Sequence, residues 1–302
     1  MIQEHLESIY KMNLETLLRE RRPNLTDSSI KTYASTLRGI LKAVYPKETP
    51  SADLFNHVDT ILLHYMDESP KKLNSKLASL YVLTENPKYG EALSKNLTKI
   101  KSENAKQVKN EKQKECTLDQ DDLKSLWLKL KLESDMLYKK PDLSDKEYQH
   151  IQMFIILSLL GGIFIPPRRA MDYCLFKKVK DTDDFNYMFK NKLVFNKYKT
   201  AKTYGQQTID LPKELKAILV KWIKRNPTEW LLFDSHHQPL TSVKLNQRFE
   251  KLFGKKCAIN SLRHSYLSDK YSEHIPMRRE LAQDFKDMGS SVGQETTYVQ
   301  EK

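Results

Sequence analysis

Apolar residues recur at helical spacing through the first hundred residues of the chain. After the polar stretch Thr26-Asp27-Ser28-Ser29, which offers several N-cap residues, the apolar positions are Ile30, Tyr33, Leu37, Ile40, Leu41 and Val44. Pro46 cannot continue that helix. The same pattern predicts further helices over residues 52–65, 71–83 and 89–100. Residues 1–98 are therefore expected to form an all-helical domain.

The pattern breaks over residues 99–116, where lysines stand among Asn, Gln and Glu with hardly any apolar residue. Such a stretch is typical of a solvated linker, and this one is basic. The residues from Thr117 to Leu123 then place carboxylates where the first turn of a capped helix would be. We expect a second domain over residues 117–302.

The second domain changes its period part-way along. Short β-rich runs at 187–190, 193–197 and 207–211 lie between polar turns, and the turn at 199–205 is expected to be a hairpin tip. Helical patterns resume at residues 213–225, at 242–253 and from residue 260. The sequence thus predicts a mainly α fold with a small antiparallel β-sheet in the C-terminal domain.

Several protein classes are disfavoured. The longest apolar run, 151–165, is interrupted and too short to cross a bilayer, which favours a buried core helix and no membrane partner. The N-terminus lacks signal-peptide features. Cys116, Cys174 and Cys257 are far apart and show no metal-ligand spacing, so we expect no disulfide framework, no metal, no cofactor and an intracellular location.

The formal net charge of +12 suits a polyanionic partner such as nucleic acid, although charge alone also fits a simple need for solubility. Basic residues lie on one face of the helix after Thr26 and in the linker, where they are either DNA-backbone contacts or ordinary solvated charges. These candidates are Lys31, Arg38, Lys42, Lys106 and Lys109.

Arginines stand where the apolar run of the second domain stops. Pro166 and Pro167 end the helix, and Pro167 is suited to open a new one with Arg168 and Arg169 in its first turn. Exposed N–H groups there favour an anion, and a phosphate would remove the conflict between two arginines and the helix dipole. Asp172, three residues after Arg169, is expected to hold the Arg169 guanidinium.

A second group of polar residues lies near the C-terminus. Asn260-Ser261-Leu262-Arg263-His264 opens a probable helix, and Tyr298 follows a polar turn that contains Ser290. If this group meets the arginine pair, it forms an oxyanion site beside a nucleophile, as in a DNA phosphotransferase. Each residue has an ordinary alternative: Tyr298 is one of fifteen tyrosines, and His264 fits a packed core histidine.

These residues in this order resemble the tyrosine recombinase (phage-type integrase) family over residues 117–302. Arg169 with Asp172 resembles the first arginine and its acidic partner, Asn260–His264 the His-x-x-Arg-His box, and Lys199 the β-turn lysine. Thr297-Tyr298 resembles the nucleophile box. Arg169 precedes Arg263 by 94 positions, and Tyr298 follows Arg263 by 35. The Pro-Pro-Arg-Arg form looks most like integrases of large DNA viruses and mobile elements.

The resemblance implies a site-specific recombinase acting on double-stranded DNA without metal or ATP. Tyr298 would form a 3′-phosphotyrosine, Arg169 and Arg263 would bind the phosphate, Lys199 would protonate the leaving oxygen, and His264 would be the base. Lys202 would contact the DNA backbone. Arg168 would either do the same or support the residues that bind the phosphate, although a one-residue shift would exchange its role with that of Arg169. The N-terminal domain would be the core-binding domain, and a protein that is monomeric when free would form a tetramer on two DNA sites, in a host nucleus, a virus factory or a cytoplasm.

Two residues depart from the family pattern, which keeps other functions open. Asn260 stands where a histidine is usual, and Ser290 stands where histidine or tryptophan is usual. A catalytically decayed DNA-binding protein is therefore one alternative, and a type IB topoisomerase with the same chemistry is another. An RNA- or membrane-binding basic protein would leave the ordered set of residues as coincidence.

Overall fold

The computed structural model describes residues 12–106, 108, 114–115, 118–180, 182–254, 257, 259–290, 293 and 295. The contacts within the chain divide it into two compact units, Met1–Val108 and Lys109–Lys302.

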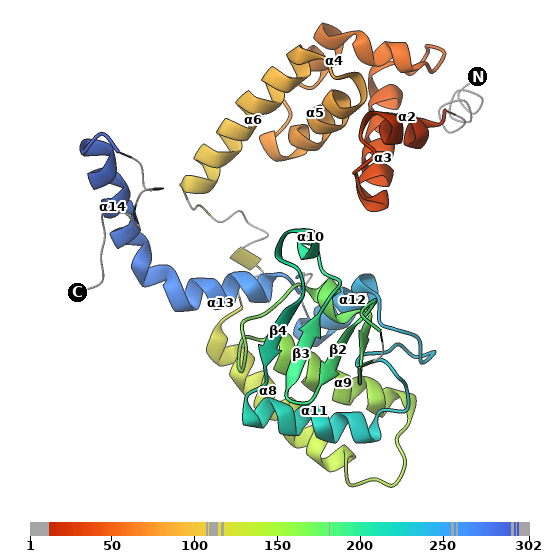
Figure 1. Cartoon of the computed structure of the whole chain (residues 1–302), viewed down its shortest axis with the longest axis vertical. Coiled ribbons are helices and arrows are strands. Elements are labelled where there is room, and N and C mark those ends of the chain that lie inside the picture. Colours follow the sequence, from red (N-terminus) through yellow and green to blue (C-terminus); the bar gives the residue numbers. More distant parts are fainter. Residues whose placement is uncertain are drawn as a thin grey trace. The chain divides into compact units, whose positions relative to one another are not determined.

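The described residues of the first unit form helices and no strand (Figure 1). In chain order these are α2 (Leu14–Arg21), α3 (Asp27–Val44), η1 (Ala52–Asn56), α4 (Val58–His64), α5 (Pro70–Thr84) and α6 (Pro87–Ala105). Thr26 caps α3, accepting a hydrogen bond from the backbone N–H of Ser29 at 3.2 Å. The apolar face of α3 is buried in the core of this unit, as its periodicity predicted.

Two expectations for this unit differ from the structure. The single helix predicted over 52–65 is the 3-10 turn η1 followed by α4, because the backbone of His57 between them leaves the helical region at φ −78° and ψ 66°. The helix predicted to stop at residue 100 continues as α6 to Ala105. The first seven residues of the expected linker therefore belong to a helix, since lysine is a good helix former even without an apolar face.

The second unit combines helices with one small sheet (Figure 1). Its helices are α8 (Gln120–Leu137), α9 (Asp145–Leu160), η2 (Ala170–Tyr173), α10 (Ala201–Tyr204), α11 (Lys213–Arg225), α12 (Ser242–Phe253), α13 (Ser261–Tyr271), η3 (Ser272–His274) and α14 (Ile275–Asp287). Its strands are β1 (Phe176–Lys177), β2 (Asn186–Phe189), β3 (Lys192–Phe195) and β4 (Gln207–Asp210). The expectation of a mainly helical chain with a small sheet is confirmed.

The sheet is mixed rather than antiparallel. Its order is β1-β2-β3-β4, with β2–β3 and β3–β4 antiparallel, as in the pairing of Val194 with Tyr187 and with Thr208. The strand β1, however, pairs parallel to β2. The prediction of an antiparallel sheet was wrong at this edge, because a two-residue strand is too short to show any periodicity.

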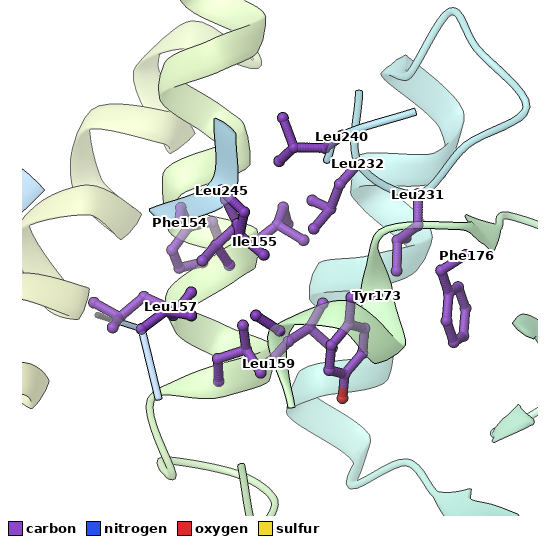
Figure 2. Packing of buried hydrophobic residues seen from close by; sticks show 14 of the residues in the cluster. Phe154, Ile155, Leu157, Leu159, Tyr173, Phe176, Leu231, Leu232, Leu240 and Leu245 are labelled. Atoms are coloured by element: carbon purple, nitrogen blue, oxygen red, sulfur yellow. The ribbon is translucent and has the colours of Figure 1, made fainter. Parts of the chain in front are cut away.

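The core of the second unit is built around α9. A capping box between Ser144 and Glu147 starts this helix, and nearly all of its residues from Ile151 to Leu160 are buried. Figure 2 shows side chains of α9, such as Phe154 and Leu159, packed with Tyr173 and with leucines of the 231–245 segment. The predicted buried core helix is thus confirmed. No helix among the described residues is both long and apolar enough to cross a membrane.

The cysteines differ from one another. Cys174 is free and buried, and burial raises the pKa of its thiol to about 11. Cys257 is completely buried and disulfide-bonded. The expectation of no disulfide framework did not foresee the bond of Cys257, because spacing along a sequence does not reveal which thiols the fold brings together.

Candidate functional site

The segment between α9 and η2 is an extended turn and not the start of a helix. Gly161 ends α9, Gly162 adopts a positive φ of 77°, and Arg169 is extended with φ −67° and ψ 142°. The prediction that Pro167 opens a helix with both arginines in its first turn was wrong. Each proline disfavours helical geometry in the residue before it, and only the single 3-10 turn of η2 forms before the chain enters β1.

Arg168, rather than Arg169, is the arginine bound to Asp172. Its Nε donates to Oδ2 of Asp172 at 3.1 Å, and one of its terminal nitrogens donates to Oε1 of Gln207 at 2.9 Å. The Asp172 side chain is 3% exposed and that of Arg168 16% exposed, so this ion pair is well shielded from water. The expected Arg169–Asp172 pair assumed helical spacing, which the extended turn does not provide.

Arg168 also lies against two aromatic rings. Its guanidinium carbon is 4.0 Å from the ring centre of Phe195, the last residue of β3, and 4.9 Å from that of Tyr198. Phe195 in turn packs edge-to-face with Tyr173, with the two ring centres 5.6 Å apart. Arg168 therefore packs against aromatic residues at the edge of the core, and its charge is stabilised by cation–π contacts as well as by Asp172.

The pKa of Asp172 is affected by the charges of three arginines. Burial raises the pKa of this carboxyl, while the charge and hydrogen bond of Arg168 and the charges of Arg169 and Arg263 act against that rise. Coulomb interactions weaken with distance, so the charges of Arg169 and Arg263 act on this carboxylate from the same region of the fold as Arg168. The fold thus brings together two arginines that are 94 positions apart in the sequence.

The side chains of Arg169 and Arg263 differ from that of Arg168. Both residues are half-buried, and neither guanidinium forms a hydrogen bond or an ion pair with any residue in the part of the chain that the structure describes. Two guanidinium groups with unused donors beside a shielded carboxylate form a region of net positive charge. Such groups are well suited to bind the oxygens of a phosphate.

The helix α13 carries Arg263 and is fixed to the same turn. Leu262, next to Arg263, is completely buried. A Cβ built on Gly162 would lie only 2.6 Å from the ring of Tyr266, one helical turn after Leu262. The absence of a side chain at Gly162 therefore lets α13 pack against the turn that leads to the arginine pair.

The other residues predicted beside Arg263 are closer to solvent. Asn260 is exposed and precedes α13 without capping it through its side chain, while its backbone oxygen accepts from the N–H of Arg263 at 3.2 Å. His264 is exposed, which argues against a packed core histidine. The hydroxyl of Ser261 is buried and has no hydrogen-bond partner among the residues that the structure describes. The sequence pattern assigned no role to it.

Lys199 and Lys202 lie in the connection between β3 and β4. Both are exposed, and Lys202 belongs to α10, the short helix at the far end of the connection (Figure 1). β3 and β4 pair antiparallel as predicted, but residues 196–206 form a longer loop with one helical turn and not a tight hairpin. Lys199 has no ion-pair partner among the described residues.

Asn186 also belongs to the surroundings of this site, and the sequence analysis did not single it out. It is buried, its Nδ2 donates to the backbone oxygens of Asp172 at 2.7 Å and Lys197 at 2.8 Å, and its Oδ1 accepts from the N–H groups of Asn196 and Lys197 at 2.8 Å each. One asparagine thus satisfies backbone groups from two segments. Nothing in the pattern of β2 distinguishes it from an ordinary strand residue.

The C-terminal candidates are described only in part. Ser290 follows α14 in a Schellman motif, where its N–H donates to the oxygen of Phe285 at 2.8 Å and Gly289 has a φ of 69°. Tyr298 lies outside the described residues, so its role stays a prediction.

The basic candidates of the first unit differ in their surroundings. Arg38 donates to both carboxylate oxygens of Glu15, at 2.9 and 2.7 Å, and this joins α3 to α2. That pairing gives Arg38 a structural role and leaves its predicted DNA contact without support. Lys31 and Lys106 are exposed, Lys42 is half-buried, and Lys109 lies outside the described residues.

No protein-family model and no curated protein matches the sequence. Among solved structures, the chain is similar to that of a lambda integrase(75–356), a dimer bound to a COC′ core site. The two share 16% identity over 91% of this chain and 90% of that chain, with a TM-score of 0.46. The roles of individual residues here rest on their own surroundings.

Proposed function

We propose that this chain is a DNA strand transferase of the tyrosine recombinase kind. The observation that carries the proposal is that the charges of Arg169 and Arg263 both act on the buried Asp172, while α13, which carries Arg263, packs closely against Gly162. Neither guanidinium forms a hydrogen bond with a described residue. Two like charges in one region repel each other, and a bound anion would offset that repulsion. The ordered spacing of these residues with Lys199 and Tyr298 in the sequence makes that anion a DNA phosphate.

Each residue then has a chemical role. The Tyr298 hydroxyl attacks the phosphorus, its proton passes to His264, and the bond to the 5′-oxygen breaks as Lys199 supplies that oxygen with a proton. The products are a 3′-phosphotyrosine and a free 5′-hydroxyl. Arg169 and Arg263 stabilise the extra negative charge of the transition state. The ester keeps the energy of the broken bond, so rejoining needs no ATP.

The same proposal assigns roles to the rest of the chain. The lysine-rich exposed surface, with Lys31, Lys106 and Lys202 as examples, would neutralise DNA phosphates and release counterions. Asn260 would donate a hydrogen bond to the phosphate. Ser290, which follows the end of α14, would donate another. Four protomers would join two DNA sites during strand exchange.

A second candidate function is DNA binding without cleavage. It is favoured by Asn260, whose amide cannot exchange a proton, and by Ser290, a weaker donor than histidine. In that case Arg169 and Arg263 would still bind a phosphate, but no covalent bond would form.

Covalent trapping separates these functions. The wild-type chain and Tyr298→Phe are incubated with labelled duplexes of random sequence that are nicked so that the cleaved end diffuses away. The matched control is Tyr271→Phe, which alters another tyrosine near the C-terminus. A denaturing gel should show a protein–DNA adduct for the wild type and Tyr271→Phe and none for Tyr298→Phe. Salt-sensitive binding without any adduct would favour the second candidate.

A further inference from the structure

The β3–β4 connection, residues 196–206, is fixed at several points although it is a surface loop. The hydroxyl of Tyr198 donates to the backbone oxygen of Gly205 at 2.7 Å, and Nε2 of Gln206 donates to Oδ1 of Asn196 at 2.7 Å. These two bonds tie the two sides of the connection to each other. They do not join it to the arginine-bearing turn.

Arg168 makes that join through its side chain. Its guanidinium lies on Phe195 at 4.0 Å and Tyr198 at 4.9 Å on the incoming side of the connection, and it donates to Gln207 at 2.9 Å on the outgoing side. Its Nε is bound to Asp172 at 3.1 Å. The Arg168 guanidinium therefore contacts both sides of the β3–β4 connection and also Asp172.

Arg168 is the wrong arginine to bind a substrate phosphate directly. Its side chain is 16% exposed, it already has a carboxylate partner, and two aromatic rings lie close to its guanidinium carbon. Arg169 has none of these partners. The two neighbouring arginines thus have different roles, one inside the protein framework and one available to a ligand.

We propose that Arg168 is a positioning residue, which holds the β3–β4 connection so that Lys199 faces the phosphate bound by Arg169 and Arg263. The positioning of Lys199 for proton transfer rests on the proposed function. The anchoring of the connection does not, since it depends only on contacts within the chain. Asn186 supports the same arrangement by joining the backbone of Asp172 to that of Lys197, two residues before Lys199.

An arginine suits this role better than a lysine. The guanidinium is planar and forms several hydrogen bonds in fixed directions while it stacks on an aromatic ring, whereas an ammonium group is a compact point charge. Arg168→Lys keeps the positive charge beside Asp172 but loses the stacking and one of the two hydrogen-bonded connections. It is therefore the variant that tests positioning without removing the charge.

The first arm of the test measures hydrogen exchange of the full-length chain and needs no activity. Arg168→Lys should speed the exchange of residues 196–206 by about tenfold or more, with α9 and α11 unchanged. Gln207→Ala removes only one of these contacts, so it should speed the hydrogen exchange of residues 196–206 by a smaller factor. Arg169→Lys is the matched control and should leave it as in the wild type. Unchanged exchange of 196–206 in Arg168→Lys would overturn the proposal.

The second arm tests the consequence for Lys199. A duplex recovered by covalent trapping is made again with sulfur in place of the leaving 5′-oxygen, because a thiolate leaves without needing a proton. Arg168→Lys and Lys199→Ala should both cleave ordinary DNA slowly and recover to within about tenfold of the wild type on the sulfur duplex. Arg169→Lys and Arg169→Ala should stay slow on both.

The outcomes are distinct. A slow Arg168→Lys on both duplexes would overturn the positioning of Lys199, and normal cleavage of ordinary DNA by this variant would do the same. A wild-type chain that traps no DNA would contradict the proposed function, while the exchange arm would still decide whether Arg168 anchors the connection.

Discussion

Arg168 donates a hydrogen bond from Nε to the buried carboxylate of Asp172 at 3.1 Å, and its neighbour Arg169 does not. The pairing assigns the two consecutive arginines different tasks. Arg168 neutralises Asp172 inside the protein. The Arg169 guanidinium forms no hydrogen bond with a described residue and, on the proposed function, binds the DNA phosphate. A buried carboxylate without Arg168 would be costly, because an unpaired charge in a poorly solvated place is strongly destabilising.

Removing the side chain of Arg169 or Arg263 should slow cleavage of DNA much more than it weakens DNA binding. We expect Arg169→Ala and Arg263→Ala each to slow adduct formation about 10²–10³-fold, since each loses donors to the charge of the transition state. Affinity for intact duplex, measured by gel shift, should fall much less. Arg279→Ala on the exposed α14 is the control and should react like the wild type. Equal reactivity of Arg169→Ala and wild type would remove Arg169 from the site.

Adding one methyl group at Gly162 should disturb the position of Arg263. The φ of 77° disfavours any residue with a side chain, and the new Cβ would lie 2.6 Å from the ring of Tyr266. We expect Gly162→Ala to lower the free energy of unfolding by about 1–3 kcal/mol. Thermal unfolding measures this loss. The double variant Gly162→Ala/Tyr266→Ala removes the clash, and a purely additive result in the double-mutant cycle would show that the two residues do not interact.

Asp234 should make the stability of the second unit depend on pH at the acid end. Burial opposes ionisation of this carboxyl, but the hydrogen bonds from Lys244 and from the N–H groups of His236 and Gln238 lower its pKa to about 2. A carboxyl with a lowered pKa stabilises the fold above its unfolded value of about 4, and this contribution is lost as pH falls towards 2. It is worth on the order of 2 kcal/mol.

The test for Asp234 is acid unfolding of Asp234→Asn beside the wild type. The variant should be less stable at neutral pH, and the difference between the two should shrink between pH 4 and pH 2. Glu229→Gln, at a more exposed carboxylate, is the control. A difference that stays constant over this range would contradict the lowered pKa.

Lys31 and Arg38 lie on the same helix, yet their substitution should have different effects. Lys31 is exposed, so Lys31→Ala should reduce the slope of log affinity against log salt by about 1 if it contacts a phosphate. Arg38 is bound to Glu15, so Arg38→Ala should lower the stability of the first unit by about 1–2 kcal/mol. Gel shifts at several salt concentrations and thermal unfolding separate the two. A lost salt slope without lost stability in Arg38→Ala would show that Arg38 binds DNA after all.

Elements with long periodic patterns could be predicted from the sequence, and those set by tertiary contacts could not. The helices α11 and α12 begin and end at the predicted residues, because their apolar faces repeat over several turns. The parallel strand β1 has two residues and no pattern. The arginines could be singled out from their order, but the exchange of partners between Arg168 and Arg169 depends on Phe195, Tyr198 and Gln207, which only the folded chain brings near.

The most direct test of the central claim is to identify the residue that becomes bonded to DNA. Trapped adduct from the wild-type chain is digested with protease and nuclease, and the peptide that carries a nucleotide is sequenced by mass spectrometry. We expect one modified peptide, with the nucleotide linked through a 3′-phosphate to Tyr298. A nucleotide on any other residue, or an adduct that persists in Tyr298→Phe, would contradict it.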